Sequence, residues 1–242
     1  WAKRIGFSKS ELPTQKSSKE DVSISDGKNI IVCDAKAFRL GRSQGAPNVK
    51  DVLKHSDIKK WLSHHKTLNK LGGLVTFPSQ HDWKKGSDFY QYTTDNSSPT
   101  LSLYYEHLSF FICSEIDSST LINIFKKYSE VFPEKKTKNE NNRSYYYTEM
   151  EKNLFKGYEQ QWLDFSKVAS KVVSEKAFHC KHQLDIHIAL IKQTIEKEYE
   201  NVEDIEFLRK KVIEAEYLNA TEDLHKQTER ITRFRKLSKN YL

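Results

Sequence analysis

Apolar and polar positions alternate with the two-residue period of a β-strand near the start of the chain. Val22 and Ile24 alternate with serines, and Asp26-Gly27 favours a tight turn because both residues tolerate a positive φ. The next run, residues 29–40, contains Ile30-Ile31-Val32-Cys33, which is apolar on both faces. The pattern predicts a β-hairpin whose second strand lies in the middle of a sheet.

The segments around this hairpin are less regular. Residues 1–20 are polar and predict an irregular or edge segment. Residues 48–63 carry apolar side chains at helical spacing and predict one helix, with Asn48 as its cap. Residues 74–77 predict a short buried strand that Pro78 ends. Strands and helices therefore alternate in this part of the chain.

The period changes to that of a helix in the second half. Residues 100–113 predict a strand and then a short helix, and residues 134–144 predict a polar linker. Helices are predicted at 118–131, 146–175, 183–200 and 203–237. The last two carry apolar side chains on one face, namely Ile186, Leu190, Ile205, Leu208 and Val212. We expect an α/β core over 1–115 and a helical region over 116–242.

Composition is typical of a folded protein without a membrane partner. Of 242 residues, 37 % are hydrophobic and 12 % aromatic, which argues against a disordered chain. No apolar run approaches the roughly 18 residues of a membrane span. The three cysteines have no zinc-like spacing, and an odd number is best suited to a reducing cytoplasm.

The net charge of +7 lies in one part of the chain. Residues 1–100 contain 17 Lys and Arg against 10 Asp and Glu, whereas residues 101–242 contain 23 of each. This asymmetry suggests that a polyanion such as DNA binds the N-terminal region. The alternative is a solvated Lys-rich surface.

Two acidic residues and a lysine at the predicted hairpin form a candidate nuclease site. Asp34 and Lys36 are two positions apart, so their side chains project from the same face of a strand. Asp21 begins the preceding strand. Two carboxylates can hold Mg²⁺ beside a phosphate, and a lysine there can orient water and offset developing charge.

The D-x-K spacing alone is not specific. Five acid-x-Lys matches occur, beginning at Asp26, Asp34, Asp57, Asp82 and Glu134. Chance alone gives about four for this composition. Asp34 differs from the others because it follows an apolar strand, where a buried charge needs a partner or a metal. An ordinary Asp–Lys ion pair at a strand end remains the alternative.

The residues after Asp34 resemble the HindIII-type restriction endonucleases, a branch of the PD-(D/E)xK nucleases. That family has a D-A-K-x-F-R-L-x-R run, a basic helix with a late Trp, and an E-H-L element. The matching segments here are Asp34–Arg42, Val49–Leu62 and Glu106-His107-Leu108. The resemblance implies a restriction-endonuclease-like fold, with a central mixed sheet flanked by helices and a helical C-terminal region.

The resemblance also implies roles for the site residues. Asp21, Asp34 and Lys36 are then catalytic, and Asp21, Asp34 and the Ala35 carbonyl hold Mg²⁺. Asp26 is the competitor of Asp21, although its tight turn makes it a weaker choice. The counterpart of a further upstream Glu of the family stays open between Glu11, Glu20 and a residue before Trp1. DNA contacts are expected from Arg39, Arg42, Ser43, Gln44, Lys50 and Lys54.

These expectations describe a Mg²⁺-dependent type II restriction endonuclease in the cytoplasm of a bacterium. It would act on double-stranded DNA at a specific, palindromic site as a homodimer and leave 5′-phosphate ends. The runner-up is a repair or recombination nuclease of the same superfamily without sequence specificity. A DNA-binding protein that keeps the fold without catalysis is the non-enzymatic alternative.

Overall fold

The computed structural model describes residues 1–13, 19–36, 47–80, 83, 88–95, 98–133, 140–200 and 205–235. The chain divides into two compact units, and within the described residues the boundary lies between Ser166 and Lys167. We refer to them as the sheet unit and the helical hairpin. Within the described ranges, no helix combines the length and apolar character that crossing a membrane requires.

The sheet unit is built on five strands in the order β1-β2-β3-β4-β5. β1, β2 and β3 pair antiparallel, whereas β3, β4 and β5 pair parallel, so the sheet is mixed as predicted. The strands are β1 (Lys9–Glu11), β2 (Val22–Ser25), β3 (Asn29–Ala35), β4 (Asn69–Phe77) and β5 (Thr100–Tyr104). β3 is the middle strand, and it is buried from its first residue through Asp34.

The predicted hairpin is present between β2 and β3. Gly27 has a φ of 94°, which the turn requires. The carboxylate of Asp26 accepts hydrogen bonds from the backbone N–H groups of Lys28 and Asn29 at 2.8 and 2.6 Å. Residues 1–20 include the edge strand β1, in agreement with the sequence. β3 ends at Ala35, and the remainder of the predicted strand, 37–40, lies outside the described residues.

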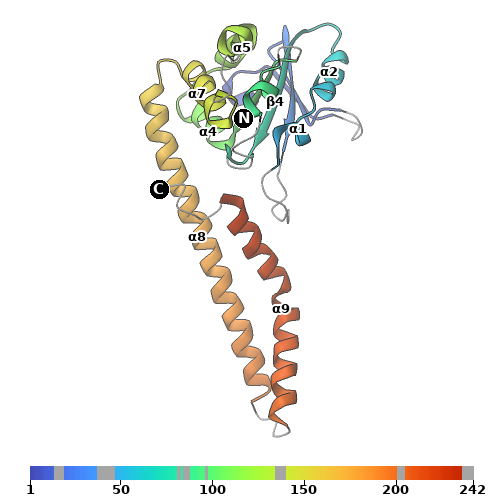
Figure 1. The fold of residues 1–242 in the computed structure, drawn as a ribbon, viewed down its shortest axis with the longest axis vertical. Coiled ribbons are helices and arrows are strands. Elements are labelled where there is room, and N and C mark those ends of the chain that lie inside the picture. The colour runs from blue at the N-terminus through green and yellow to red at the C-terminus, as the bar shows by residue number, and fades with distance from the viewer. Residues whose placement is uncertain are drawn as a thin grey trace. The chain divides into compact units, whose positions relative to one another are not determined.

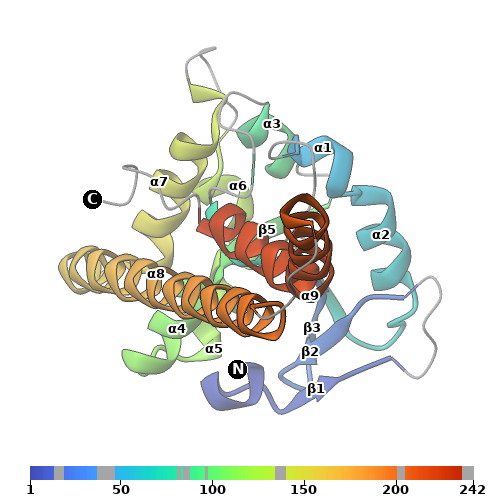
Figure 2. The same cartoon turned by 90° about the horizontal axis from the view of Figure 1, so that it is seen from below.

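Helices cover both faces of the sheet (Figures 1 and 2). One face carries α1 and α2, and the other carries α4, α5 and α7. A Cβ at Gly73 would lie 2.6 Å from Cδ1 of Ile58 in α2, and one at Gly72 would lie 2.7 Å from Cε1 of Phe125 in α5. Adjacent glycines in β4 therefore let both helix layers approach the sheet closely. The helices of this unit are η1 (Ala2–Ile5), α1 (Val49–Val52), α2 (His55–Ser63), α3 (Phe89–Thr93), α4 (Tyr105–Cys113), α5 (Ser118–Lys126), α6 (Tyr128–Val131) and α7 (Arg143–Leu154).

The single helix predicted over 48–63 is wrong, because the chain breaks between α1 and α2. Leu53 has an extended backbone and is 1 % exposed, so its side chain enters the core. Its carbonyl accepts a hydrogen bond from the Tyr92 hydroxyl at 2.8 Å, which replaces the helical partner. Asn48 occupies the cap position of α1, but its side chain makes no capping hydrogen bond.

The C-terminal helices also differ from the prediction. The helix expected over 146–175 is interrupted between α7 and α8 (Glu159–Glu198), where Gly157 has a φ of 87°. The expected break between 175 and 183 is absent, since α8 is continuous there. α9 (Glu206–Arg235) follows as expected. The sheet unit extends to Ser166, past residue 115, because α5 and α7 pack into its core.

A buried hydrogen-bond network joins four elements of the sheet unit. The Glu151 carboxylate in α7 accepts from the Tyr104 hydroxyl and from Nε2 of His107 at 3.0 and 2.9 Å, and from Nε1 of Trp162 at 3.0 Å. His107 Nδ1 accepts from the Tyr104 backbone N–H at 3.2 Å. Both nitrogens of this fully buried imidazole are therefore satisfied. The network attaches the start of α8 to β5, α4 and α7.

Candidate active site

The parallel strands place the candidate residues at one edge of the sheet. β3, β4 and β5 run in the same direction, so their carboxyl ends meet there. Asp34 pairs with Val75, and Val75 shares the sheet face of Gly73 because side chains alternate along a strand. The Gly73 face is the face that α2 covers. Asp34 and, two residues later, Lys36 therefore lie on the α2 face at the end of β3.

Asp34 and Lys36 form a close ion pair. Lys36 Nζ lies 2.8 Å from Oδ2 of Asp34, whose side chain is only 12 % exposed, whereas that of Lys36 is 30 % exposed. Burial raises the pKa of Asp34, the ammonium of Lys36 opposes that shift, and the charge of Asp21 adds to it. The backbone N–H of Lys36 donates to the Thr76 carbonyl at 2.8 Å, which anchors the residue to β4.

Asp21 joins the pair from the neighbouring strand. Its backbone N–H donates to the Cys33 carbonyl at 2.9 Å, and its Oδ2 accepts from the Ala35 N–H at 2.7 Å. These bonds hold the carboxylate against the end of β3, close enough to raise the pKa of Asp34. The structure therefore brings Asp21, Asp34 and Lys36 together.

The competitor Asp26 has a structural role instead. Both of its carboxylate oxygens accept hydrogen bonds, Oδ1 from two backbone N–H groups and Oδ2 from Nδ2 of Asn29 at 2.7 Å. Burial raises its pKa, but these hydrogen bonds outweigh that effect and lower it overall. Asp26 lies at the turn, at the opposite end of the hairpin from Asp34.

A second acidic residue, Glu20, lies beside Asp21 and is 4 % exposed. Its Oε1 accepts from the Ser23 hydroxyl at 2.6 Å and from Nε2 of His65 at 2.8 Å. Its Oε2 is buried and makes no hydrogen bond within the described residues. Burial raises the pKa of Glu20, but the bonds from Ser23 and His65 more than offset it, so the pKa is lowered. The sequence gives no signal for the pairing with His65, which is 45 positions away.

The predicted DNA-contacting residues are only partly described. Arg39, Arg42, Ser43 and Gln44 lie outside the described residues. Lys50 lies in α1 and Lys54 directly precedes α2, and both are exposed. Lys54 Nζ donates to the Lys50 backbone carbonyl at 2.9 Å, so the Lys54 ammonium lies beside the backbone of α1.

The acidic cluster suits a hard divalent cation. Two carboxylates lie at the end of β3, and a single lysine offsets their charge there. Mg²⁺ is commonly bound through one or two carboxylates together with water and substrate phosphate. The carboxylates of Asp21 and Asp34 match that requirement. Across the described ranges, no three His, Cys, Asp or Glu side chains converge as a complete metal cage.

Known proteins similar to this chain include a restriction endonuclease family and one solved restriction endonuclease subunit. The sequence profile described as HindIII restriction endonuclease matches residues 2–221. Among solved structures, the small subunit of the heterodimeric restriction endonuclease R.BspD6I is similar at a TM-score of 0.37 and 11 % identity, over 68 % of this chain and 82 % of that one. No curated protein sequence matches the chain.

Proposed function

Since the chain belongs to the HindIII restriction endonuclease family and is a type II site-specific deoxyribonuclease, we propose that its active centre consists of Asp21, Asp34 and Lys36. The observation that carries this proposal is the Asp34–Lys36 pair at 2.8 Å, with the Asp21 carboxylate fixed beside it. Carboxylates and a lysine at a strand end provide what phosphodiester hydrolysis requires.

Each residue has a distinct part in the proposed mechanism. Asp21, Asp34 and the Ala35 carbonyl would hold Mg²⁺. When bound, the ion would supply Lewis acidity toward the scissile phosphate. Lys36 is partly exposed, so its ammonium can leave Asp34, orient the attacking water and favour loss of the proton from that water. Attack in line with the 3′ oxygen would leave a 5′-phosphate and a 3′-hydroxyl.

We also infer how the protein engages its substrate. Cutting both strands of a palindromic site calls for two active centres related by a two-fold axis, hence a homodimer. Lys50 and Lys54 would contact phosphates, and Arg39, Arg42, Ser43 and Gln44 would contact phosphate or base edges. Residues 116–242 would contribute to dimerisation and DNA contacts. The DNA substrate of the family implies action in the bacterial cytoplasm.

The decisive experiment compares plasmid cleavage by the wild type with Mg²⁺ or EDTA and by three variants. Asp34→Asn and Lys36→Met each remove one member of the pair and should lower the cleavage rate by at least about a thousandfold. Asp57→Asn with Lys59→Met is the matched control. It removes the same D-x-K spacing from α2, where both side chains are exposed, and should leave the rate unchanged.

The products separate the alternatives. Discrete fragments that require Mg²⁺ support a site-specific enzyme, and end-labelling would identify the 5′-phosphate. A continuous smear would favour the repair-type nuclease. Calcium binding, followed calorimetrically, should weaken in Asp34→Asn independently of cleavage. Intact DNA in Mg²⁺ with the full-length wild type would reject the proposal in favour of a DNA-binding protein.

A further inference from the structure

Helix α8 carries an exposed row of apolar side chains in the helical hairpin. We call Val168, Val172, Ile186 and Leu190 the outer stripe, and they are 62, 46, 42 and 53 % exposed. At 3.6 residues per turn, all four fall within about 40° of the helix circumference and span about 33 Å along its axis. Solvated helices normally place polar residues on such a face, so the stripe needs a partner.

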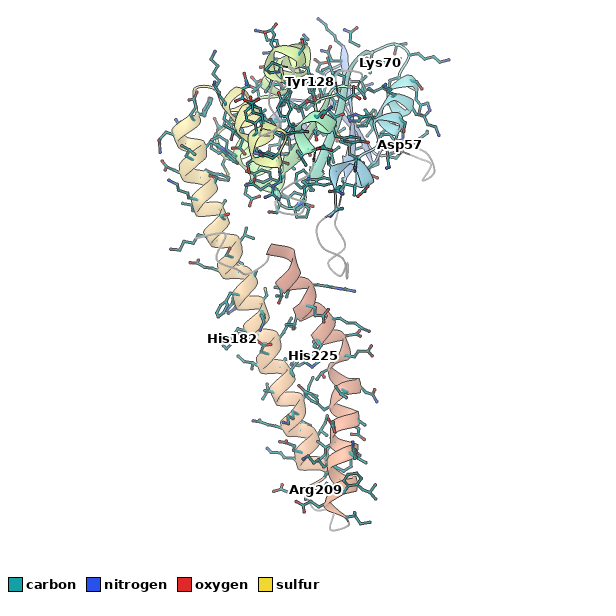
Figure 3. The ribbon with its side chains drawn as sticks, in the orientation of Figure 1. Asp57, Lys70, Tyr128, His182, Arg209 and His225 are labelled. Atoms are coloured by element: carbon teal, nitrogen blue, oxygen red, sulfur yellow. The ribbon has the colours of Figure 1, made fainter. Side chains whose placement is uncertain are left out.

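The stripe is not the face that α8 uses within its own chain. Ile188 and Ile195 are 8 and 7 % exposed and lie on the opposite side of the helix. Ile195 lines one groove with Asn219 and Ala220 of α9. α9 runs antiparallel beside α8 (Figures 1 and 3). The Tyr199 hydroxyl, just after the end of α8, donates a hydrogen bond to the Glu216 carboxylate of α9 and so joins the two helices. α8 therefore has two apolar faces, and only one of them is covered by α9.

The outer stripe is symmetric about one residue, His179. Val172 and Ile186 lie seven positions on either side of it, and Val168 and Leu190 lie eleven positions on either side. His179 falls on the same arc of the helix. If two such helices met antiparallel about a two-fold axis at His179, Val168 would face Leu190 of the other copy and Val172 would face Ile186. A two-fold interface requires this kind of self-complementary pattern.

We propose that the outer stripe is the surface on which a second copy of this chain docks, with the two α8 helices antiparallel and centred on His179. This inference rests on the proposed two-copy enzyme and adds the surface that assembles it. Two hairpins joined in this way place four helices around a shared apolar layer. A parallel pairing would align Val168 with itself and would make no use of the symmetry.

The charges beside the stripe fit the same register. Lys171 and Asp185 lie eight positions before and six positions after His179, on the same flank of the stripe. In the antiparallel pair, Lys171 of one copy would lie within about one turn of Asp185 of the other and join the Lys181–Asp185 ion pair, which measures 2.8 Å. On this flank Phe178 is 65 % exposed and stacks on His182 with ring centroids 6.5 Å apart. Phe178 would meet its own symmetry mate near the axis.

DNA is a poorer occupant for this surface. Residues 167–198 contain six Lys and four Asp or Glu, so this part of α8 has little excess positive charge. The two ends of the stripe are aliphatic and Glu175 lies between them, whereas DNA-binding surfaces are strongly basic and polar. The Leu190 end of the stripe borders a groove of about 670 Å³ between α8 and α9, lined by Ile191, Ile195 and Ala220 among others, which extends the apolar surface.

The predicted contact between Val168 and Leu190 of the other copy gives a test by charge exchange. In the full-length chain, Val168→Glu and Leu190→Lys should each raise the dimer dissociation constant at least about tenfold, measured by sedimentation velocity without DNA or Mg²⁺. The double variant Val168→Glu/Leu190→Lys places opposite charges across the interface twice and should recover most of the wild-type affinity. Val168→Lys/Leu190→Lys should not.

Controls separate assembly from folding and from catalysis. Leu163→Glu alters an equally exposed leucine on α8 that lies outside the stripe, and it should leave the dissociation constant unchanged. Circular dichroism should show the same helicity in every variant. Asp34→Asn should remain dimeric, so loss of cleavage and loss of the dimer can be told apart. The proposal is overturned by a monomeric wild type, by single variants that dimerise normally, or by a double variant as weak as the singles.

Discussion

The sheet unit and the helical hairpin distribute their hydrophobic side chains in opposite ways. In the sheet unit the largest aromatics, such as Phe77, Phe111 and Tyr146, are fully buried. In the described residues fourteen large hydrophobic side chains are exposed, and ten of them lie in residues 167–235. Among the described side chains of residues 167–232, only Ile188, Ile195 and Thr221 are buried. The sheet unit therefore contains its own core, whereas the hairpin needs a further surface to complete one.

Removing a core aromatic should give the largest loss of stability and so test this contrast directly. Phe111 is fully buried and packs edge-on against Trp1 and Phe155, with centroids 5.7 and 5.9 Å away. Phe111→Ala should lower the free energy of unfolding by about 3–5 kcal/mol in urea titrations, because it leaves a cavity. Leu218→Ala in α9, where the side chain is 56 % exposed, should lower it by less than about 0.5 kcal/mol. Equal losses would contradict the assignment of the core to the sheet unit.

A smaller but still large effect is expected in the network that attaches α8 to the sheet unit. Glu151→Gln keeps the shape of the side chain but replaces one acceptor oxygen with a donor that faces Trp162, Tyr104 or His107. One buried donor then loses its partner, which should cost about 1–3 kcal/mol of unfolding free energy. Thermal unfolding followed by tryptophan fluorescence would report it.

The helical hairpin again provides the control for this substitution. Glu222 is exposed and pairs with Lys226 at 2.6 Å within α9. Exposed pairs of this kind contribute little, so Glu222→Gln should leave the unfolding temperature unchanged. If Glu222→Gln were as damaging as Glu151→Gln, the distinction between a buried network and a solvated pair would fail.

Local chemistry explains which parts of the sheet unit could be predicted. The β2–β3 turn could be predicted from the sequence because it depends on local features. The Asp26 carboxylate accepts a hydrogen bond from a nearby backbone N–H, and Gly27 adopts a positive φ. Asp34 and Lys36 were readable as a pair because a strand has a period of two. The break between α1 and α2 at Leu53 could not be predicted, since it depends on the hydroxyl of Tyr92, 39 positions away. Tertiary contacts there override a good helical pattern.

The same reasoning explains what could not be predicted in the candidate active site and in the helical hairpin. The Glu20–His65 bond joins residues whose positions carry no shared pattern, so only the fold reveals it. The apolar residues Ile186 and Leu190 were correctly grouped on one face, but α9 covers the opposite face, with Ile188 and Ile195. Periodicity identifies an apolar face without saying which neighbour covers it.

The smallest expected effect concerns the pH dependence of stability, and it also distinguishes the two regions. The pKa of Asp34 is raised in the folded chain, chiefly by burial, so the folded state holds its proton more tightly than the unfolded state does. The stability associated with this proton is complete below the ordinary pKa of an aspartate and is lost as pH rises through the raised value.

The urea midpoint of the wild type should therefore fall, relative to that of Asp34→Asn, as pH rises through this window. Adding Mg²⁺ should reverse the fall, because the ion selects the ionised carboxylate. Asp223→Asn, at a 91 % exposed carboxylate of the helical hairpin, should parallel the wild type throughout. A wild type that parallels Asp34→Asn would show that Asp34 titrates as an ordinary surface group.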